Sequence, residues 1–167
     1  PNCEPRTCQG TGLMSQTPSL VLVTGASGHI GANLVRSLLR RGNRVRALIH
    51  VDTTALQGLD VETVQGDITD YASLGPALRD VDLLYHGAAY ISISGRGWTA
   101  MRRRNVEGTR NVVRGCVQSG VRRLVHFSSI HATADCGPEA VINEQTPLAL
   151  GAGGAPYDRS KAEAEQF

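Results

Sequence analysis

Aromatic residues and long apolar runs are both scarce in this sequence, and each shortage narrows what the chain can be. Aromatic residues make up 4% of the 167, with two Phe and one Trp, so a folded core has to be built from aliphatic side chains. No apolar run approaches the roughly 20 residues that a membrane-spanning helix needs. The N-terminus also lacks the apolar segment of a secretory signal peptide. We therefore expect a cytoplasmic protein that makes no membrane contact.

The sequence also lacks a large excess of charge of one sign and cysteines at the spacing of a paired motif. The 17 basic and 15 acidic residues leave a formal net charge of +2, which does not indicate nucleic-acid binding. We interpret the one basic run, Arg102–Arg104, as the solvated face of a helix rather than a phosphate site. The cysteines have neither CxxC spacing nor histidine partners at zinc spacing, which predicts free thiols in a reducing compartment and no metal site. They are Cys3, Cys8, Cys116 and Cys136.

The length of the chain allows one full domain but not two of ordinary size, and 41% of its residues are hydrophobic. Residues 1–13 show neither strand nor helix periodicity, and a natural start at Met14 would explain them. We interpret 1–18 as a leader that is disordered or non-native, and we expect the domain over 19–167. Residues 160–167 form a helical pattern without a glycine or proline to end it. This predicts a chain truncated inside its last helix, with a C-terminal substrate domain missing.

Between these ends, strand-like and helix-like patterns alternate. The expected strands are 19–23, 44–49, 61–64, 81–85 and 123–127, and the expected helices are 29–41, 71–78, about 99–119 and the segment after Pro156. Strands that alternate with helices form a parallel sheet with helices on both faces. Because crossovers are right-handed, the economical topology is a doubly wound α/β sheet, the Rossmann fold.

A glycine-rich turn follows the first strand and opens the first helix, with the sequence Thr24-Gly25-Ala26-Ser27-Gly28-His29-Ile30-Gly31. Its glycines permit a tight turn, a close approach of backbone to a pyrophosphate and close helix–strand packing. The helix N-terminus adds free N–H groups and a positive dipole end. The position in the first βαβ unit favours dinucleotide binding over a purely structural turn. The cofactor contacts expected here come from Thr24, Gly25, Ser27, Gly28, His29, Ile30 and Gly31.

The end of the second strand bears on the choice between NAD and NADP. An acidic residue there would hold the ribose 2′-hydroxyl of NAD, but this strand ends at His50, and Asp52 lies two residues beyond. A cationic or neutral tip suits the 2′-phosphate of NADP better. Arg46 is a further candidate for that phosphate, unless strand alternation points it elsewhere. The prediction leans to NADP, with NAD as the alternative.

Three residues suggest proton transfer at a carbonyl or alcohol. Free tyrosine is mostly protonated at neutral pH, so it needs help to act as a base. Tyr157 and Lys161 share a helix face at i and i+4, and the lysine charge would lower the tyrosine pKa. Ser129 follows the fifth strand, at the edge where ligands bind in such sheets, and would orient the substrate oxygen. Its neighbour Ser128 is the alternative.

Six segments in this order resemble the extended short-chain dehydrogenase/reductases, the NAD-dependent epimerase/dehydratase family. They are Thr24-Gly25-x-x-Gly28-x-x-Gly31, Gly66-Asp67, His86-Gly87-Ala88-Ala89, Asn105-Val106-Glu107-Gly108-Thr109, Ser128-Ser129 and Tyr157-Asp158-Arg159-Ser160-Lys161. The resemblance runs from about Ser19 to the last residue. It implies that Lys161, next to Tyr157, also holds the nicotinamide ribose and that the Asn105 helix packs on the sheet. Further cofactor contacts that it implies are Asp67 at the adenine, Ile68, Ala88 and Ala89.

Some features distinguish branches of this family. The Tyr-Gly pair that follows the serine loop in nucleotide-sugar epimerases is replaced by Ala132–Asp135. This favours a relative of the dihydroflavonol reductases or 3β-hydroxysteroid dehydrogenases. His131 is either a substrate contact or an exposed loop residue. Glu144 resembles part of a family loop and is interpreted as loop structure.

The sequence therefore predicts an NAD(P)-dependent oxidoreductase that acts on a secondary alcohol or ketone of a small molecule. The alternative is a nucleotide-sugar epimerase or dehydratase that uses the same Ser-Tyr-Lys set. A dinucleotide-sensing regulator without turnover is less favoured, because it has no need of that set. The resemblance also allows a homodimer through the helix that carries Tyr157. We predict that the chain by itself turns substrate over poorly.

Overall fold

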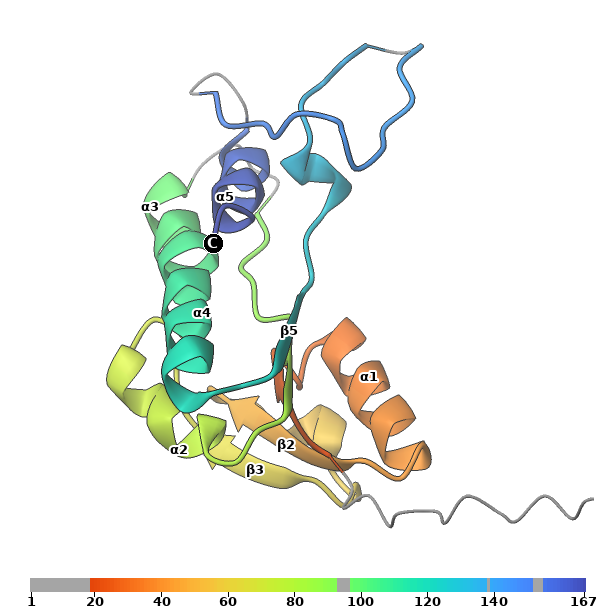
Figure 1. Ribbon diagram of the computed structural model, residues 1–167, viewed down its shortest axis with the longest axis vertical. Coiled ribbons are helices and arrows are strands. Elements are labelled where there is room, and N and C mark those ends of the chain that lie inside the picture. The colour runs from red at the N-terminus through yellow and green to blue at the C-terminus, as the bar shows by residue number, and fades with distance from the viewer. Residues whose placement is uncertain (1–18, 93–96, 138, 152–154) are drawn as a thin grey trace, which may run out of the picture.

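A computed structural model describes residues 19–92, 97–137, 139–151 and 155–167. The expected leader, together with Cys3 and Cys8, lies outside the described residues. The chain forms a five-stranded parallel sheet in the order β3-β2-β1-β4-β5 (Figure 1). The strands are β1 (Leu20–Thr24), β2 (Arg44–Ile49), β3 (Glu62–Gln65), β4 (Leu83–His86) and β5 (Arg123–His126). The order reverses at β1, which confirms the doubly wound α/β fold, and each strand lies close to its predicted range.

Helices cover both faces of the sheet. They are α1 (His29–Arg40), η1 (Thr54–Leu56), η2 (Tyr71–Leu74), α2 (Gly75–Leu78), α3 (Trp98–Met101), η3 (Arg102–Glu107), α4 (Gly108–Ser119), η4 (Ile130–Ala132) and α5 (Pro156–Ala164). Figure 1 shows α1 on one side of the sheet and α2 with α4 on the other. The helix predicted over about 99–119 is continuous but passes through a π-helical segment, η3. The last helix ends at Ala164 rather than continuing to Phe167.

The core consists of two aliphatic layers, one on each face of the sheet. All five residues of β1 are buried, so its side chains supply both layers in alternation. Leu22 and Leu84 pack with Val112 of α4 on one face, while Val23 and Val35 pack on the α1 face. Each fully buried side chain of this size contributes about 1.5–3 kcal/mol relative to exposure. This buried central strand therefore fixes the position of the turn that follows it.

Arg46 belongs to this scaffold, not to a phosphate site. Its side chain is 8% exposed and points toward α2. Its Nε lies 2.8 Å from Glu62 Oε1, and its Nη1 donates to the carbonyl oxygens of Ala77 at 2.9 Å and Arg79 at 2.6 Å. The idea that Arg46 assists a cofactor 2′-phosphate is therefore wrong, because alternation along β2 turns it into the core.

Two histidines stack at the carboxyl ends of β4 and β5, with ring centroids 5.3 Å apart. His86 is buried and holds Thr24 Oγ1 at 2.7 Å and Thr109 Oγ1 at 3.0 Å. Neither ring nitrogen of His126 has a hydrogen-bond partner among the described residues. Burial, with the nearby positive charges as a smaller cause, lowers the pKa of His86 to about 3 and that of His126 to about 4. Both rings are therefore neutral in the folded state near neutral pH.

This pair predicts a loss of stability in mild acid. Between pH 6.5 and about 4 the unfolded histidines bind protons that the folded ones do not, so the free energy of unfolding falls as the pH falls. His126→Leu is expected to flatten this dependence by about 1 kcal/mol across the window, allowing for solvent screening of a partly exposed group. Urea unfolding at several pH values measures it. His29→Leu, at an exposed position, is the control, and equal slopes in both variants would contradict the prediction.

Candidate cofactor and active site

The glycine turn between β1 and α1 forms a backbone cradle. Gly25 has φ +69°, which favours glycine, and its carbonyl oxygen accepts from the Gly28 N–H at 3.0 Å. A Cβ at Gly31 would lie 2.1 Å from Gly25 O, and one at Gly28 would lie 3.3 Å from the same oxygen. The first turn of α1 has no side-chain cap and no acidic residue. Its N–H groups and positive dipole end are therefore available to an anion such as a pyrophosphate.

A cleft of about 370 Å³ opens beside this turn along the carboxyl ends of the strands. Its lining includes eight of the residues predicted to bind cofactor: Gly25, Ser27, Gly28, His50, Asp67, Ile68, Ala88 and Ala89. It also includes five that the sequence reasoning did not predict: Leu48, Gly66, Gly87, Tyr90 and Arg104. The size, the glycine cradle and the anion-binding helix end suit a dinucleotide.

Four residues of the predicted turn set do not line the cleft. Thr24 is buried, and its hydroxyl also accepts from the Ala88 N–H at 3.3 Å, so it ties the turn to the loop after β4. Gly31 is buried under the turn. His29 and Ile30 are exposed, Ile30 by 61%. They lie on the first turn of α1 with their side chains directed to solvent, so backbone N–H groups are what this end of α1 offers a ligand.

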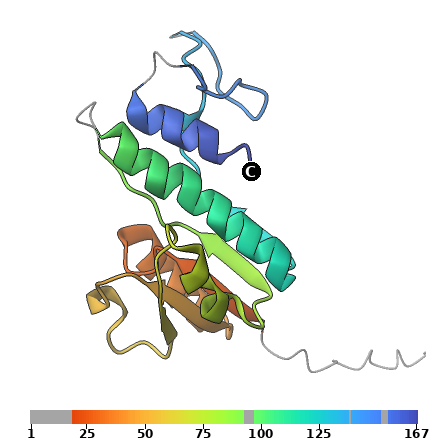
Figure 2. The ribbon, with the colours of Figure 1, turned by 90° about the vertical axis from the view of Figure 1, so that its left-hand side faces the viewer.

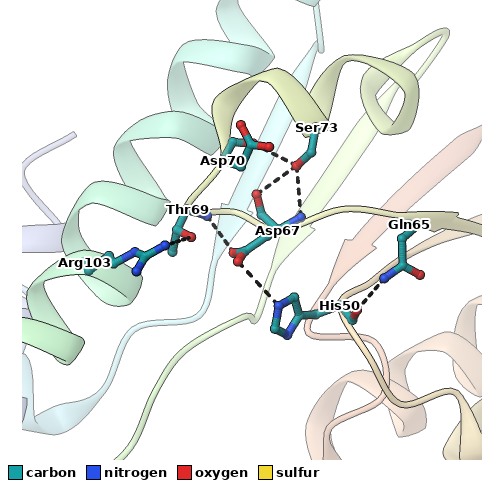
Figure 3. A network of polar contacts seen from close by, with 7 residues as sticks. All are labelled: His50, Gln65, Asp67, Thr69, Asp70, Ser73 and Arg103. Atoms are coloured by element: carbon teal, nitrogen blue, oxygen red, sulfur yellow. Dashed lines mark hydrogen bonds and ion pairs between the residues drawn. The ribbon is translucent and has the colours of Figure 1, made fainter.

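The carboxyl ends of β2 and β3 meet at one end of the cleft (Figure 3). His50 Nε2 lies 3.4 Å from Asp67 Oδ2, and Gln65 donates to the His50 carbonyl. Burial acts to raise the pKa of Asp67, but hydrogen bonds from Thr69 and the charges of His50 and Arg103 outweigh it, and the pKa is lowered. The carboxylate is therefore ionised at neutral pH and faces the His50 imidazole.

This geometry corrects the prediction that the end of β2 offers no carboxylate. The sequence suggested a tip without a carboxylate, because Asp52 lies beyond the strand. Asp52 indeed points away and accepts from the Thr54 N–H at 2.8 Å. However, β2 and β3 are parallel neighbours, so Asp67, after β3, arrives beside His50. The tip therefore presents an imidazole and a carboxylate together.

The basic run is not simply a solvated face. Successive residues of a helix point in different directions, so the three arginines make different contacts. Arg102 Nη2 lies 3.2 Å from Glu107 Oε1, and Arg103 Nη2 is 3.4 Å from Thr69 Oγ1. The Arg104 guanidinium lies 4.9 Å from the centre of the Tyr90 ring and lines the cleft. All three arginines are exposed, as a solvated face requires, but Arg104 also brings a positive charge to the cleft.

The predicted serine, tyrosine and lysine come from η4 and α5. Ser129 precedes η4, and its Oγ accepts from the His131 N–H at 3.2 Å. Tyr157 lies in the first turn of α5 and is half-buried. Lys161 is 3% exposed, and its Nζ donates to the carbonyl oxygen of Phe127 at 2.7 Å. Burial lowers the pKa of Lys161, with Glu165 opposing the shift.

The neighbouring serine lies in a different place. Ser128 lines a separate hollow with His126 and Glu165, while Ser129 contacts η4. Adjacent residues in extended backbone point in opposite directions. The structure thus separates the two candidates, with Ser128 at this hollow and Ser129 at the start of η4.

A buried amide connects α5 to the cleft. Asn105 in η3 is 2% exposed. It donates to Ser160 Oγ at 2.9 Å and to the carbonyl oxygen of Tyr90 at 2.9 Å, and it accepts from the Tyr90 N–H at 2.7 Å. Figure 2 shows α5 packed along the helix formed by α3, η3 and α4. The helix that carries Tyr157 and Lys161 is thereby fixed relative to the cleft-lining loop.

This fold, with a glycine cradle at β1 and Tyr157 and Lys161 on the helix beyond β5, defines an extended short-chain dehydrogenase/reductase. More specifically, the chain belongs to the 3-beta hydroxysteroid dehydrogenase/isomerase family, a family of enzymes whose model matches residues 22–167. The sterol demethylase protein B of Methylococcus capsulatus is 44% identical over 146 residues, covering 86% of this chain and 44% of that protein.

Solved structures agree with this assignment. A short-chain dehydrogenase/reductase superfamily protein from Agrobacterium tumefaciens with bound NAD is 30% identical, with a TM-score of 0.75 over 88% of this chain and 43% of that one. MoeE5 in complex with UDP-glucose and NAD is 31% identical, with a TM-score of 0.74 over 87% of this chain and 46% of that one. The chain thus spans less than half the length of these relatives. Within the described residues, no helix is both long and apolar enough to cross a membrane.

Proposed function

We propose that this chain is the cofactor-binding part of an NAD(P)-dependent oxidoreductase that acts on a secondary alcohol or ketone of a small molecule. The observation that carries the proposal is the packing of η4, which directly follows Ser129, against α5, which carries Tyr157 and Lys161. None of these three residues lines the cleft beside the glycine cradle, and we propose that a bound cofactor extends from the cleft to them. The family and the NAD bound to the similar Agrobacterium tumefaciens protein support it.

Tyr157, Ser129 and Lys161 would have different roles in the proton transfer of such a reaction. The bound nicotinamide would supply or accept the hydride. Tyr157 donates its hydroxyl proton to the substrate oxygen during reduction and takes it back during oxidation. The Ser129 hydroxyl already accepts from the His131 N–H, so its own proton is free to bind the substrate oxygen. Lys161 uses one N–H on Phe127 and keeps two for the ribose and the neighbourhood of the tyrosine.

The charged groups near the end of β2 bear on the choice between NAD and NADP. The preference for NADP predicted from His50 remains a prediction. Arg104 in the cleft favours an additional phosphate, whereas Asp67 beside His50 opposes one and can accept from a ribose hydroxyl instead. Two of the similar structures hold NAD. We therefore propose NAD or NADP as the cofactor.

Calorimetric titration of the chain with NADPH and with NADH tests this proposal. Binding of either nucleotide is expected, and tighter NADPH binding would support the His50 prediction. Tighter NADH binding would refute that prediction while keeping the cofactor site. Two variants show which side chain causes a difference in affinity. His50→Ala removes the imidazole and should weaken NADPH binding more than NADH binding. Asp67→Ala removes the carboxylate and should weaken NADH binding more than NADPH binding. If a folded chain bound neither nucleotide, the proposed function would be wrong.

A second candidate is a nucleotide-sugar epimerase or dehydratase. The similarity to MoeE5, solved with UDP-glucose and NAD, favours it, whereas the sequence at 132–135 departs from the epimerase pattern. Net consumption of cofactor distinguishes the two, because an epimerase returns its cofactor to the starting state after each turnover. A homodimer through α5 remains a prediction, and light scattering of the purified chain measures it.

A further inference from the structure

We propose that His131 is a positioning residue that holds Tyr157 in place against Ser129, with Asp158 as its anchor. The proposal rests on the proposed function, since it concerns the same tyrosine. His131 is the middle residue of η4, the short helix directly after Ser129. Asp158 directly follows Tyr157 in the first turn of α5. The two segments pack against each other, so the side chain of His131, the second residue after Ser129, contacts the first turn of the helix that carries Tyr157.

Three contacts of His131 converge on this site. Its backbone N–H donates to Ser129 Oγ at 3.2 Å. Its Nδ1 lies 3.1 Å from Asp158 Oδ1. Its ring meets the Tyr157 ring edge-on, with centroids 5.8 Å apart and an interplanar angle of 67°. The backbone of His131 therefore orients the serine, while its side chain contacts the tyrosine and the residue after it.

The contact with Asp158 gives the imidazole a defined orientation. A carboxylate only accepts hydrogen bonds, so its approach to 3.1 Å favours the imidazole form that has a proton on Nδ1. The carboxylate is itself placed in the first turn of a helix, where the positive end of the dipole favours a negative charge. His131 has a 61% exposed side chain and Asp158 a 31% exposed one, so the pair contributes little stability by itself. The contact instead orients the imidazole, because it determines which part of the ring faces Tyr157.

Tyr157 needs such a support because of its position. It is the second residue of α5, it is only half-buried, and the N-cap of that helix makes no side-chain hydrogen bond. An edge-on contact between two rings favours one ring orientation over its alternatives by about two- to twelvefold. A tyrosine that transfers a proton must hold its oxygen near the substrate oxygen, and a small displacement lowers the rate steeply.

Fluorine NMR tests the positioning without any need for turnover. The chain is labelled with 3-fluorotyrosine, and the Tyr157 resonance is assigned by its loss in Tyr157→Phe. His131→Ala is expected to shift and broaden this resonance. His131→Phe keeps a ring but loses the contact with Asp158, so its signal should be intermediate. His131→Asn keeps a donor near Asp158 without a ring and should resemble the alanine variant. Ile130→Ala is the control, because Ile130 lies in the same short helix and is 67% exposed. A Tyr157 signal that His131→Ala moves no more than Ile130→Ala does would overturn the proposal.

Kinetics provide the second readout. His131→Ala is expected to lower kcat about 10- to 100-fold with little change in the KM for cofactor, whereas Ile130→Ala should change neither. If the resonance responds and the folded parent chain binds neither NADH nor NADPH, the proposed function fails and the positioning role stands. If the parent chain turns over and His131→Ala changes neither kcat nor the resonance, the positioning role fails alone.

Discussion

Gly31→Ala is expected to abolish cofactor binding and to destabilise the domain by about 3 kcal/mol or more. The added Cβ would lie 2.1 Å from Gly25 O and 2.8 Å from Ala26 Cα. Both are backbone atoms of the turn, so no side-chain rotation relieves the clash. Either α1 moves away from β1 or the turn opens, and both changes displace the N–H groups at the start of α1.

Urea unfolding and calorimetric titration with NADH and NADPH measure the two effects. Gly75→Ala is the matched control, because a Cβ there meets nothing within 4 Å and Gly75 begins a helix. Gly28→Ala should have an intermediate effect, since its Cβ would lie 3.3 Å from the same Gly25 oxygen. A Gly31→Ala variant that binds cofactor as well as the parent chain would show that close packing of this turn is not required.

Tyr157→Phe is expected to lower turnover about 10²- to 10⁴-fold while leaving cofactor affinity nearly unchanged. The substitution removes one hydroxyl and keeps the ring, so the edge-on contact with His131 is retained. Lys161, which has its own bond to Phe127, remains available to the cofactor ribose. The loss is therefore expected in the proton-transfer step and not in binding.

A single-turnover assay with cofactor in excess detects this loss even where the parent rate is low. Tyr71→Phe is the control, because the Tyr71 hydroxyl donates to Gln118 on the surface and Tyr71 does not line the cleft. Full activity in Tyr157→Phe would remove the tyrosine from the mechanism. Normal cofactor binding by a chain that never turns over, with or without Tyr157, would favour the dinucleotide-sensing regulator instead.

The sequence predicted the elements well where a single local pattern decides the outcome. The apolar run of β1 and the glycine turn after it are both specified by neighbouring residues, and the structure has them at the predicted positions. Local patterns were insufficient for Arg46, Arg104 and Asp67. Each of these polar side chains could face a ligand, the core or the solvent, and the choice depends on elements distant in sequence.

By itself, then, the sequence determined the fold class, the anion-binding turn and the family, because strand and helix periods and short motifs need only local information. The tertiary structure decided which charges share a site. Parallel pairing of β2 with β3 brings Asp67 to His50, and packing of η4 on α5 brings His131 to Tyr157 and Asp158. These pairs lie 17 and about 27 residues apart in the chain, and no local period encodes a contact across that separation. Burial of the aliphatic layers fixes the register in which β2 and β3 end side by side, and the packing of η4 against α5 brings the second pair together.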